Sequence, residues 1–153
     1  MATRPATAAD AEAICALFLA SRAAALPFLP RLHTDAETLA WLREVVLAKQ
    51  RVFVAVGPGE TILGFAALEG VWLEHLYLRP DQRRRGIGTL LLDAVRQASP
   101  DELWLRAFQR NAEARAFYER HGFRVVARGD GATNEEREPD VTYRWTGGEP
   151  HRT

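Results

Sequence analysis

The sequence has few of the features that mark several classes of protein. Cys15 is the only cysteine in 153 residues, which excludes an internal disulfide and a metal site built from several cysteines. The four histidines are scattered, and no grouping with carboxylates has the spacing of a metal site. No apolar run approaches the roughly 20 residues that a membrane helix needs. Residues 1–5 carry no apolar signal-peptide core, so we expect a cytoplasmic protein with no membrane partner.

The chain also lacks an excess of either charge. Twenty basic and twenty acidic residues give a formal net charge of zero, and the pI is near 6.9. A neutral chain has no overall field that attracts nucleic acid, so we expect no nucleic-acid partner. With 47% hydrophobic residues, the length fits one domain, which we place at residues 1–147, with a short tail at 148–153.

The predicted elements indicate an α/β (α+β) domain. Their order, βααβββαβαββ, predicts a mixed, mostly antiparallel sheet with helices on both faces. The first helix ends at a loop with two prolines, and Gly57-Pro58-Gly59-Glu60 is the turn of a hairpin. The expected elements are strand 4–7, helix 8–24, a helix starting at 34 or 35, strands 51–56, 62–68 and 71–78, helix 86–98, strand 103–108, a helix from 111, and strands 123–127 and 141–145.

The most informative segment is Arg83-Arg84-Arg85-Gly86-Ile87-Gly88, which lies between a predicted strand and a predicted helix. Glycines allow close backbone approach, and the first helical turn presents unpaired N–H groups and a positive dipole end. The segment therefore predicts a phosphate or pyrophosphate site. It differs from the dinucleotide fingerprint, whose third glycine would fall at Leu91, and from a Walker loop, which needs Lys-Ser/Thr. A solvated basic turn, and nucleotide or RNA binding through the arginines, are the weaker alternatives.

Two motifs resemble those of a known family. Residues 83–88 resemble the Arg/Gln-x-x-Gly-x-Gly/Ala acetyl-CoA signature of the GNAT N-acetyltransferase superfamily, and residues 76–80 resemble the end of its strand 4. Residues 111–123 resemble its second motif, Asn-x-x-Ala-x-x-Phe-Tyr-x-x-x-Gly-Phe. Both motifs occur in the family's order and spacing, and the pattern covers residues 62–145. The resemblance implies a single GNAT-like domain in which strands 4 and 5 splay apart.

The resemblance also implies where acetyl-CoA, as co-substrate, would bind. Free backbone groups on the splayed strand 4 would pair with the pantetheine arm and the acetyl carbonyl. The pyrophosphate would take backbone N–H groups of the glycine turn, and no metal is expected. The Asn111 side chain would form a hydrogen bond with the pantetheine, although the N-cap of a helix is an equally good role for it. The implied acetyl-CoA contacts are Leu76, Tyr77, Leu78, Arg83, Arg84, Arg85, Gly86, Ile87, Gly88, Thr89 and Asn111.

Tyr118 and Glu74 are the candidate catalytic residues. The resemblance implies that the Tyr118 hydroxyl protonates the leaving CoA thiolate, a sound reaction for a phenol of pKa near 10. The alternative is a tyrosine at the edge of the core. Glu74 is the candidate base, because regular alternation puts it on the same strand face as Leu76 and Leu78. A structural ion pair is its alternative role, and His75 would point to the other face unless a bulge intervenes.

An acidic run precedes the last strand. Residues 134–140 contain four carboxylates, and such runs are usually solvated surface. The resemblance implies that this loop borders the acceptor cleft, where negative charge would attract a cationic amine. His33 is a further candidate for the lining of that cleft.

These observations predict an acetyl-CoA-dependent N-acetyltransferase that moves an acetyl group directly to a primary amine of a small molecule or peptide. The alternative is a catalytically idle CoA-binding or regulatory module of the same fold. The resemblance adds the expectation of a homodimer paired through the last strands.

Overall fold

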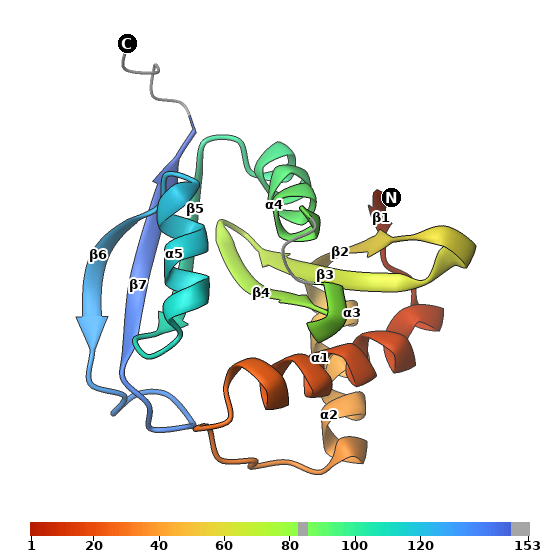
Figure 1. Cartoon of the computed structure of the whole chain (residues 1–153), viewed down its shortest axis with the longest axis horizontal. Helices are drawn as coiled ribbons and strands as arrows, with labels where there is room; N and C mark the ends of the chain where they lie inside the picture. Colours follow the sequence, from red (N-terminus) through yellow and green to blue (C-terminus); the bar gives the residue numbers. More distant parts are fainter. Residues whose placement is uncertain (83–85, 148–153) are drawn as a thin grey trace.

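The computed structural model describes residues 1–82 and 86–147. Their seven strands form one sheet in the order β1-β2-β3-β4-β5-β7-β6 (Figure 1). The predicted order of elements is confirmed. The bounds are β1 (Ala2–Pro5), α1 (Ala11–Ala25), α2 (Asp35–Trp41), α3 (Leu47–Lys49), β2 (Arg51–Val56), β3 (Ile62–Glu69), β4 (Trp72–Leu78), α4 (Ile87–Ala98), β5 (Glu102–Phe108), α5 (Ala112–Arg120), β6 (Arg124–Gly129) and β7 (Asp140–Thr146). No helix in the described part of the chain is long and apolar enough to cross a membrane.

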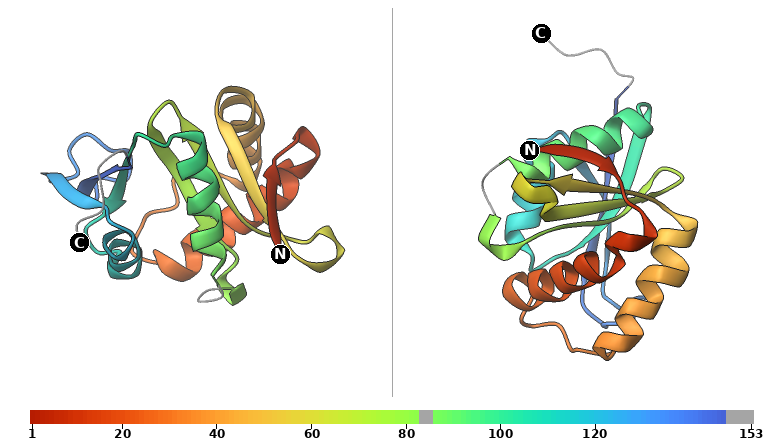
Figure 2. Two further views of the ribbon diagram at one scale, coloured as in Figure 1. Left: turned by 90° about the horizontal axis from the view of Figure 1, so that it is seen from above. Right: turned by 90° about the vertical axis from the view of Figure 1, so that its right-hand side faces the viewer.

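Helices cover both faces of the sheet, as predicted. Figure 2 shows α1 and α2 on one side of the sheet and α4 on the other. The side chains divide in the same way. One buried cluster joins α1 and the second helix to β2 and β3 through residues such as Phe18 and Phe65. The other joins α4 and α5 to β5 and β7 through residues such as Leu91 and Tyr143. Each sheet face therefore has its own core, because strand side chains alternate between the two faces.

The second helix begins as the sequence predicts. The Thr34 hydroxyl oxygen accepts a hydrogen bond from the Glu37 backbone N–H at 3.1 Å, and the Glu37 carboxylate accepts one from the Thr34 N–H at 2.8 Å. This reciprocal pairing satisfies two of the unpaired donors at the helix start. A π-helical turn over Leu42–Val46 then joins α2 to α3.

The centre of the sheet is split. All neighbouring strands are antiparallel except β4 and β5, which are parallel and whose register pairs only Trp72 with Trp104. The backbone N–H of Trp104 donates a hydrogen bond to the Val71 carbonyl oxygen at 2.8 Å, next to this pair. Towards their carboxyl ends the two strands diverge (Figure 1). The implied splay is confirmed, and it leaves one side of β4 without a strand partner beyond the pair at Trp72.

Strand β4 is not regular. Its register against β3 shifts between the pair Ala67–His75 and the pair Leu68–Leu73, so Glu74 is the extra residue of a β-bulge. The bulge resets the alternation of side chains. Leu73 therefore packs in the α4 and α5 core together with Leu76, whereas His75 lies among rings of the opposite core. The expectation of a regular strand is wrong here.

Candidate active site

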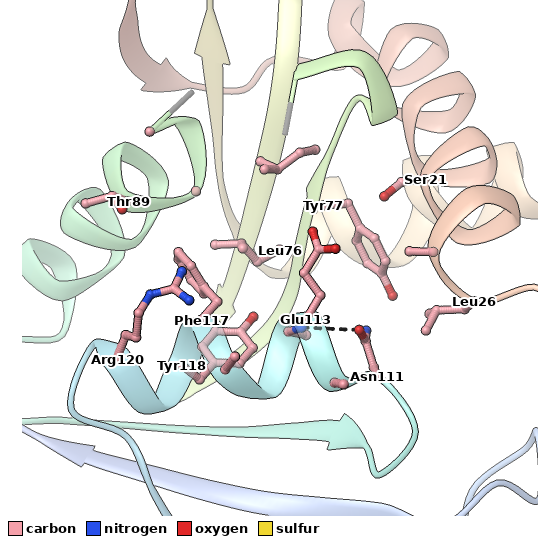
Figure 3. A pocket seen from close by; sticks show the side chains of 17 residues that line it. Ser21, Leu26, Leu76, Tyr77, Thr89, Asn111, Glu113, Phe117, Tyr118 and Arg120 are labelled. Atoms are coloured by element: carbon pink, nitrogen blue, oxygen red, sulfur yellow. Dashed lines mark hydrogen bonds between the residues drawn. The ribbon is translucent and has the colours of Figure 1, made fainter. Parts of the chain in front are cut away.

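A cavity of about 770 Å³ lies beside the split, bounded by α1, β4, the start of α4 and α5 (Figure 3). Seven of the eleven predicted acetyl-CoA contacts line it. Ile87 instead lies in the core, and Arg83, Arg84 and Arg85 fall outside the described residues. The lining residues are Ser21, Ala25, Leu26, Leu76, Tyr77, Leu78, Gly86, Gly88, Thr89, Asn111, Ala112, Glu113, Ala114, Ala116, Phe117, Tyr118 and Arg120.

The first turn of α4 supplies unpaired backbone donors. Gly86 precedes the helix with a φ of 79°, a left-handed conformation that a side chain would strain. The first bond that closes the helix runs from the Leu90 N–H to the Gly86 carbonyl, at 3.0 Å. The N–H groups of Ile87, Gly88 and Thr89 therefore have no acceptor within the helix. Together with the positive end of the helix dipole, they suit an anion.

Gly88 also sets the distance between α4 and α5. A Cβ atom at this position would lie 3.2 Å from two ring carbons of Phe117, so the missing side chain makes room for that ring. Beside this contact, the Thr89 hydroxyl lies 3.2 Å from His121 Nε2, and His121 Nδ1 lies 2.8 Å from the Phe117 carbonyl oxygen. Close packing and one hydrogen-bonded bridge thus hold the two helices together. Sequence reasoning found only the backbone role of this glycine.

Leu76, Leu78 and Asn111 each have a structural role. The two leucine side chains pack against the α4 and α5 core, while their backbone lies on the edge of β4 that β5 does not reach. The Asn111 side-chain oxygen accepts a hydrogen bond from the Ala114 N–H at 3.2 Å, drawn in Figure 3, so Asn111 is the N-cap of α5. Its Nδ2 has no hydrogen-bond partner among the residues that the structure describes. The cap is confirmed, and the pantetheine contact stays a prediction.

Tyr118 presents its hydroxyl to the cavity from α5 (Figure 3). The residue is 8% exposed, and its ring packs against Phe117 and Phe123 at centroid distances of 5.3 and 5.4 Å. Burial raises the pKa of Tyr118, so the hydroxyl keeps its proton at neutral pH. Within residues 1–82 and 86–147 the hydroxyl has no hydrogen-bond partner. It is therefore a protonated donor aimed at open space, as a proton-donor role requires.

Comparison with known proteins places this chain in a family. The family model described as "Acetyltransferase (GNAT) domain" matches residues 48–125, from α3 to β6. The chain belongs to the GNAT family. The peptidyl-lysine N-acetyltransferase YiaC of Escherichia coli K12 is 32% identical over 124 residues, which are 80% of this chain and 83% of that protein. The expected family and enzyme class, an N-acetyltransferase, are confirmed.

Solved GNAT structures share the fold. The solution structure of apo YjaB from Escherichia coli superposes with a TM-score of 0.79 at 24% identity, covering 96% of this chain and 98% of that one. The crystal structure of the PaiA N-acetyltransferase from Thermoplasma acidophilum, in complex with coenzyme A, has a TM-score of 0.71 at 19% identity, with 94% and 97% covered. At these identities the likeness establishes the GNAT fold, including the parallel β4–β5 pair.

Glu74 lies outside the cavity of this GNAT protein. It is exposed at the bulge and does not line the cavity. Partial loss of solvation, and then the negative charge of Glu69, raise the pKa of Glu74, while Arg106 acts in the opposite direction. The sequence prediction places Glu74 on the face of Leu76 and Leu78 because it assumes a regular strand. The bulge contradicts that assumption. Its role as base stays a prediction without that support.

Among the cavity side chains that the sequence argument does not identify as such are Tyr77, Glu113 and Arg120. Tyr77 was chosen for its backbone, yet its ring lines the cavity and packs against Phe18 at 4.9 Å, and burial raises its pKa. Glu113 and Arg120 line the cavity from α5, as Figure 3 shows. Tyr77 shares a strand face with His75, two residues before it, and this spacing is the signal in the sequence for the direction of the tyrosine ring. For Glu113 and Arg120, helical spacing from Phe117 is the signal in the sequence, because residues three and four apart share a helix face.

The acidic loop between β6 and β7 is not free surface. Glu135 lies 2.6 Å from His33, Glu136 lies 3.1 Å from Arg22, and both Glu138 oxygens accept bonds from Arg110 at 2.8 Å. We call these three pairs the loop clasp. The Arg110 guanidinium also lies 4.0 Å from the centre of the Phe28 ring. The clasp joins the α1 end of the molecule to the loop before β7, and it largely neutralises the charge expected to attract an amine.

Proposed function

We propose that the protein transfers an acetyl group from acetyl-CoA directly to a primary amine of a peptide or small molecule. One observation carries the proposal: a single cavity is lined by the unpaired N–H groups at the start of α4, by the free edge of β4 and by the Tyr118 hydroxyl. A donor with phosphates at one end, an amide-rich arm and a thioester at the other end matches this series.

The side chains and backbone fit each part of that donor. The α4 turn suits the pyrophosphate, and the β4 edge with Asn111 Nδ2 suits the pantetheine amides. Bound acetyl-CoA supplies a thioester whose carbonyl carbon accepts an amine and whose thiol leaves. Backbone N–H groups on the β4 edge stabilise negative charge on the carbonyl oxygen. Tyr118 donates its hydroxyl proton to sulfur.

No covalent enzyme intermediate is needed in this scheme. Cys15 is buried in α1, and it does not line the cavity. Burial raises the pKa of the Cys15 thiol, which disfavours the nucleophilic thiolate. The amine therefore attacks the thioester itself, and the cavity acts by holding both reactants together.

The relatives suggest acceptors to test. YiaC is named a peptidyl-lysine N-acetyltransferase, and a streptothricin acetyltransferase from Streptomyces lavendulae is 36% identical over 86 residues, 50% of this chain and 46% of that protein. We propose a lysine side chain in a peptide as the first acceptor and an amine antibiotic as the second. The chain itself contains one lysine, the exposed Lys49, so a K49R variant gives a peptide assay without self-acetylated lysine.

Two measurements test the proposal. Millimolar acetyl-CoA should raise the melting temperature, because a ligand that binds only the folded state stabilises it by mass action. Thiol release should then identify the acceptor in a panel of lysine peptides, polyamines and amine antibiotics. A folded protein without a thermal shift contradicts the proposal. A shift without any acceptor turnover identifies the idle CoA-binding module instead.

A further inference from the structure

A histidine lies behind the anion-binding end of the cavity. Figure 3 shows Thr89 and Arg120 at this end, away from Tyr77. His121, the C-cap of α5, does not line the cavity, but its Nε2 lies 3.2 Å from the hydroxyl of Thr89, which does. The imidazole is therefore one hydrogen bond away from the place proposed for the pyrophosphate, and a change in its charge reaches a side chain that faces the ligand.

The other ring nitrogen determines which tautomer is present. His121 Nδ1 lies 2.8 Å from the Phe117 carbonyl oxygen, and a carbonyl oxygen only accepts hydrogen bonds. Nδ1 therefore carries a hydrogen. In the neutral imidazole Nε2 then has only a lone pair, so it accepts the hydrogen of the Thr89 hydroxyl. The Thr89 hydrogen points at the histidine and is not available to a ligand in the cavity.

Protonation of the ring reverses this hydrogen bond. An imidazolium carries a hydrogen on both nitrogens, so His121 Nε2 becomes the donor and the Thr89 oxygen the acceptor. The hydroxyl hydrogen then rotates towards the cavity, where the unpaired backbone N–H groups at the start of α4 also point. An anion at this position gains one more donor, and its negative charge favours the positive ring behind that donor.

The ring is held in place for this exchange. Its centre lies 4.4 Å from that of the Phe117 ring, which in turn packs against Gly88 at the start of α4. The Arg96 guanidinium donates a hydrogen bond to the His121 backbone carbonyl oxygen. Because both the ring and the backbone are fixed, a change of protonation requires only one proton and the rotation of one hydroxyl.

Charged groups from both helices surround His121. Asp93 and Arg96 lie on α4, where the charge of Asp93 acts on Arg96. Glu119 and Arg120 lie on α5: Glu119 accepts a hydrogen bond from the hydroxyl of a β7 tyrosine at 2.6 Å, and Arg120 lines the cavity. In the part of the chain that the structure describes, none of these four side chains forms a hydrogen bond or ion pair with the imidazole. The ring is thus the group between α4 and α5 whose charge changes near neutral pH.

We propose that His121 takes up a proton when acetyl-CoA binds and, through Thr89, positions a hydrogen-bond donor at the pyrophosphate. This inference rests on the proposed function, which places the pyrophosphate at the start of α4. On binding, a pyrophosphate oxygen accepts the Thr89 O–H, the Thr89 oxygen accepts the His121 Nε2–H, and solvent supplies the proton on Nε2. No other covalent bond forms or breaks, and the proton returns to solvent when the donor leaves.

The variants isolate each part of this relay. H121F keeps an aromatic ring beside Phe117 and has nothing to titrate, and H33F makes the same change at an exposed histidine of the loop clasp. T89V removes the hydroxyl without changing the shape of the side chain, whereas T89S keeps the hydroxyl. The ligand is the acetyl thioester of dephospho-CoA. It lacks the 3′-phosphate, whose own second proton dissociates near pH 6, and its pyrophosphate has no proton to lose near neutral pH.

Calorimetric titration in buffers of different ionisation enthalpy measures both Kd and proton uptake between about pH 6 and 8.5. The wild type should bind about tenfold more tightly at the lower pH, and it should take up as much as about one proton per ligand within this range. H33F and T89S should behave in the same way. H121F and T89V should take up no proton, and their Kd should not vary with pH.

Three outcomes would overturn the inference. They are binding by the wild type without proton uptake, uptake that persists in H121F or T89V, and a pH effect seen with acetyl-CoA but not with its dephospho analogue, which would belong to the 3′-phosphate. Each of these leaves the proposed function intact, because acetyl-CoA still binds. A folded protein that binds neither ligand at any pH contradicts the proposed function and this inference with it.

Discussion

The two walls of the cavity are held in different ways. The donor wall, formed by α4 and α5, depends on backbone geometry and close packing: a left-handed Gly86, and Gly88 against the Phe117 ring. The opposite wall, formed by Ser21, Ala25 and Leu26 at the end of α1, is the one left for the acceptor, and we call it the acceptor wall. It is tied to distant segments by side-chain ion pairs such as Arg22–Glu136. Backbone geometry cannot change without strain, whereas ion pairs can be exchanged by single substitutions. The comparison indicates a fixed donor site beside an adjustable acceptor site.

The largest expected effect is at the donor wall. G86V should abolish the thermal shift with acetyl-CoA, because a side chain at a φ of 79° strains the turn and blocks backbone approach to a phosphate. No atom lies within 4 Å of a Cβ built there, so stability should fall only by the strain, about 1–2 kcal/mol. G88V adds crowding against Phe117 and should cost more. Normal acetyl-CoA binding by G86V would place the phosphates elsewhere.

The next effect concerns catalysis without a change in binding. Y118F removes one hydroxyl from a ring that stays packed against Phe117 and Phe123. Turnover should fall by about 10²-fold if this hydroxyl is the general acid, while the thermal shift with acetyl-CoA stays at the wild-type value. Steady-state thiol release measures the first quantity and thermal melting the second. An unchanged turnover would return Tyr118 to a packing role.

The aromatic cluster behind the acceptor wall should respond to acid. His75 lies among the rings of Phe18, Trp41, Phe65 and Tyr77, and burial lowers its pKa from 6.5 to about 4. The unfolded chain therefore binds this proton between pH 6.5 and 4 while the folded protein does not. Stability should fall with decreasing pH across that window, by up to about 3 kcal/mol.

Urea denaturation of the wild type and of H75F measures this effect. The variant keeps an aromatic ring in the cluster but has nothing to titrate, so its denaturation midpoint should vary less between pH 6.5 and 4. Equal slopes for the two proteins would show that other groups cause the acid sensitivity.

The smallest effect should come from the loop clasp. R110A removes the two bonds to Glu138 and the contact with Phe28; Arg110 itself is exposed, but the Glu138 carboxylate is buried and loses its ion-pair partner, so a modest loss of stability should accompany the variant. We expect a higher KM for the acceptor and an unchanged thermal shift with acetyl-CoA. R144A, which breaks an ion pair with Glu102 away from the cavity, is the matched control. A change in acetyl-CoA binding in R110A would remove the distinction between the two walls.

The sequence predicted the parts of the molecule that local rules control. The order of strands and helices, the Thr34 cap and the glycine turn that precedes α4 at Gly86 each follow from residues close together in the chain. The bulge at Glu74 was not predicted, because one extra residue in a strand leaves no mark in the hydrophobic pattern. That single residue decided the placement of the candidate base.

The acceptor wall was the least predictable part of the site. His33 and the acidic run are both candidates from the sequence, but Glu135 lies 102 positions from His33 in the chain and Glu136 lies 114 positions from Arg22. Such pairs arise only after the sheet has brought distant segments together. Charge patterns in one sequence show which residues could pair, and the topology decides which of them do.

The divergence of β4 from β5 creates a strand edge inside the molecule. Exposed strand edges are templates on which other chains add strands, and proteins usually cover or charge them. Here the edge at residues 76–78 faces a cavity walled by α1, α4 and α5, so these helices shield it from the strands of other chains. A slender, unbranched arm can enter where a strand cannot. The same split that opens a binding site thus protects the sheet from unwanted association.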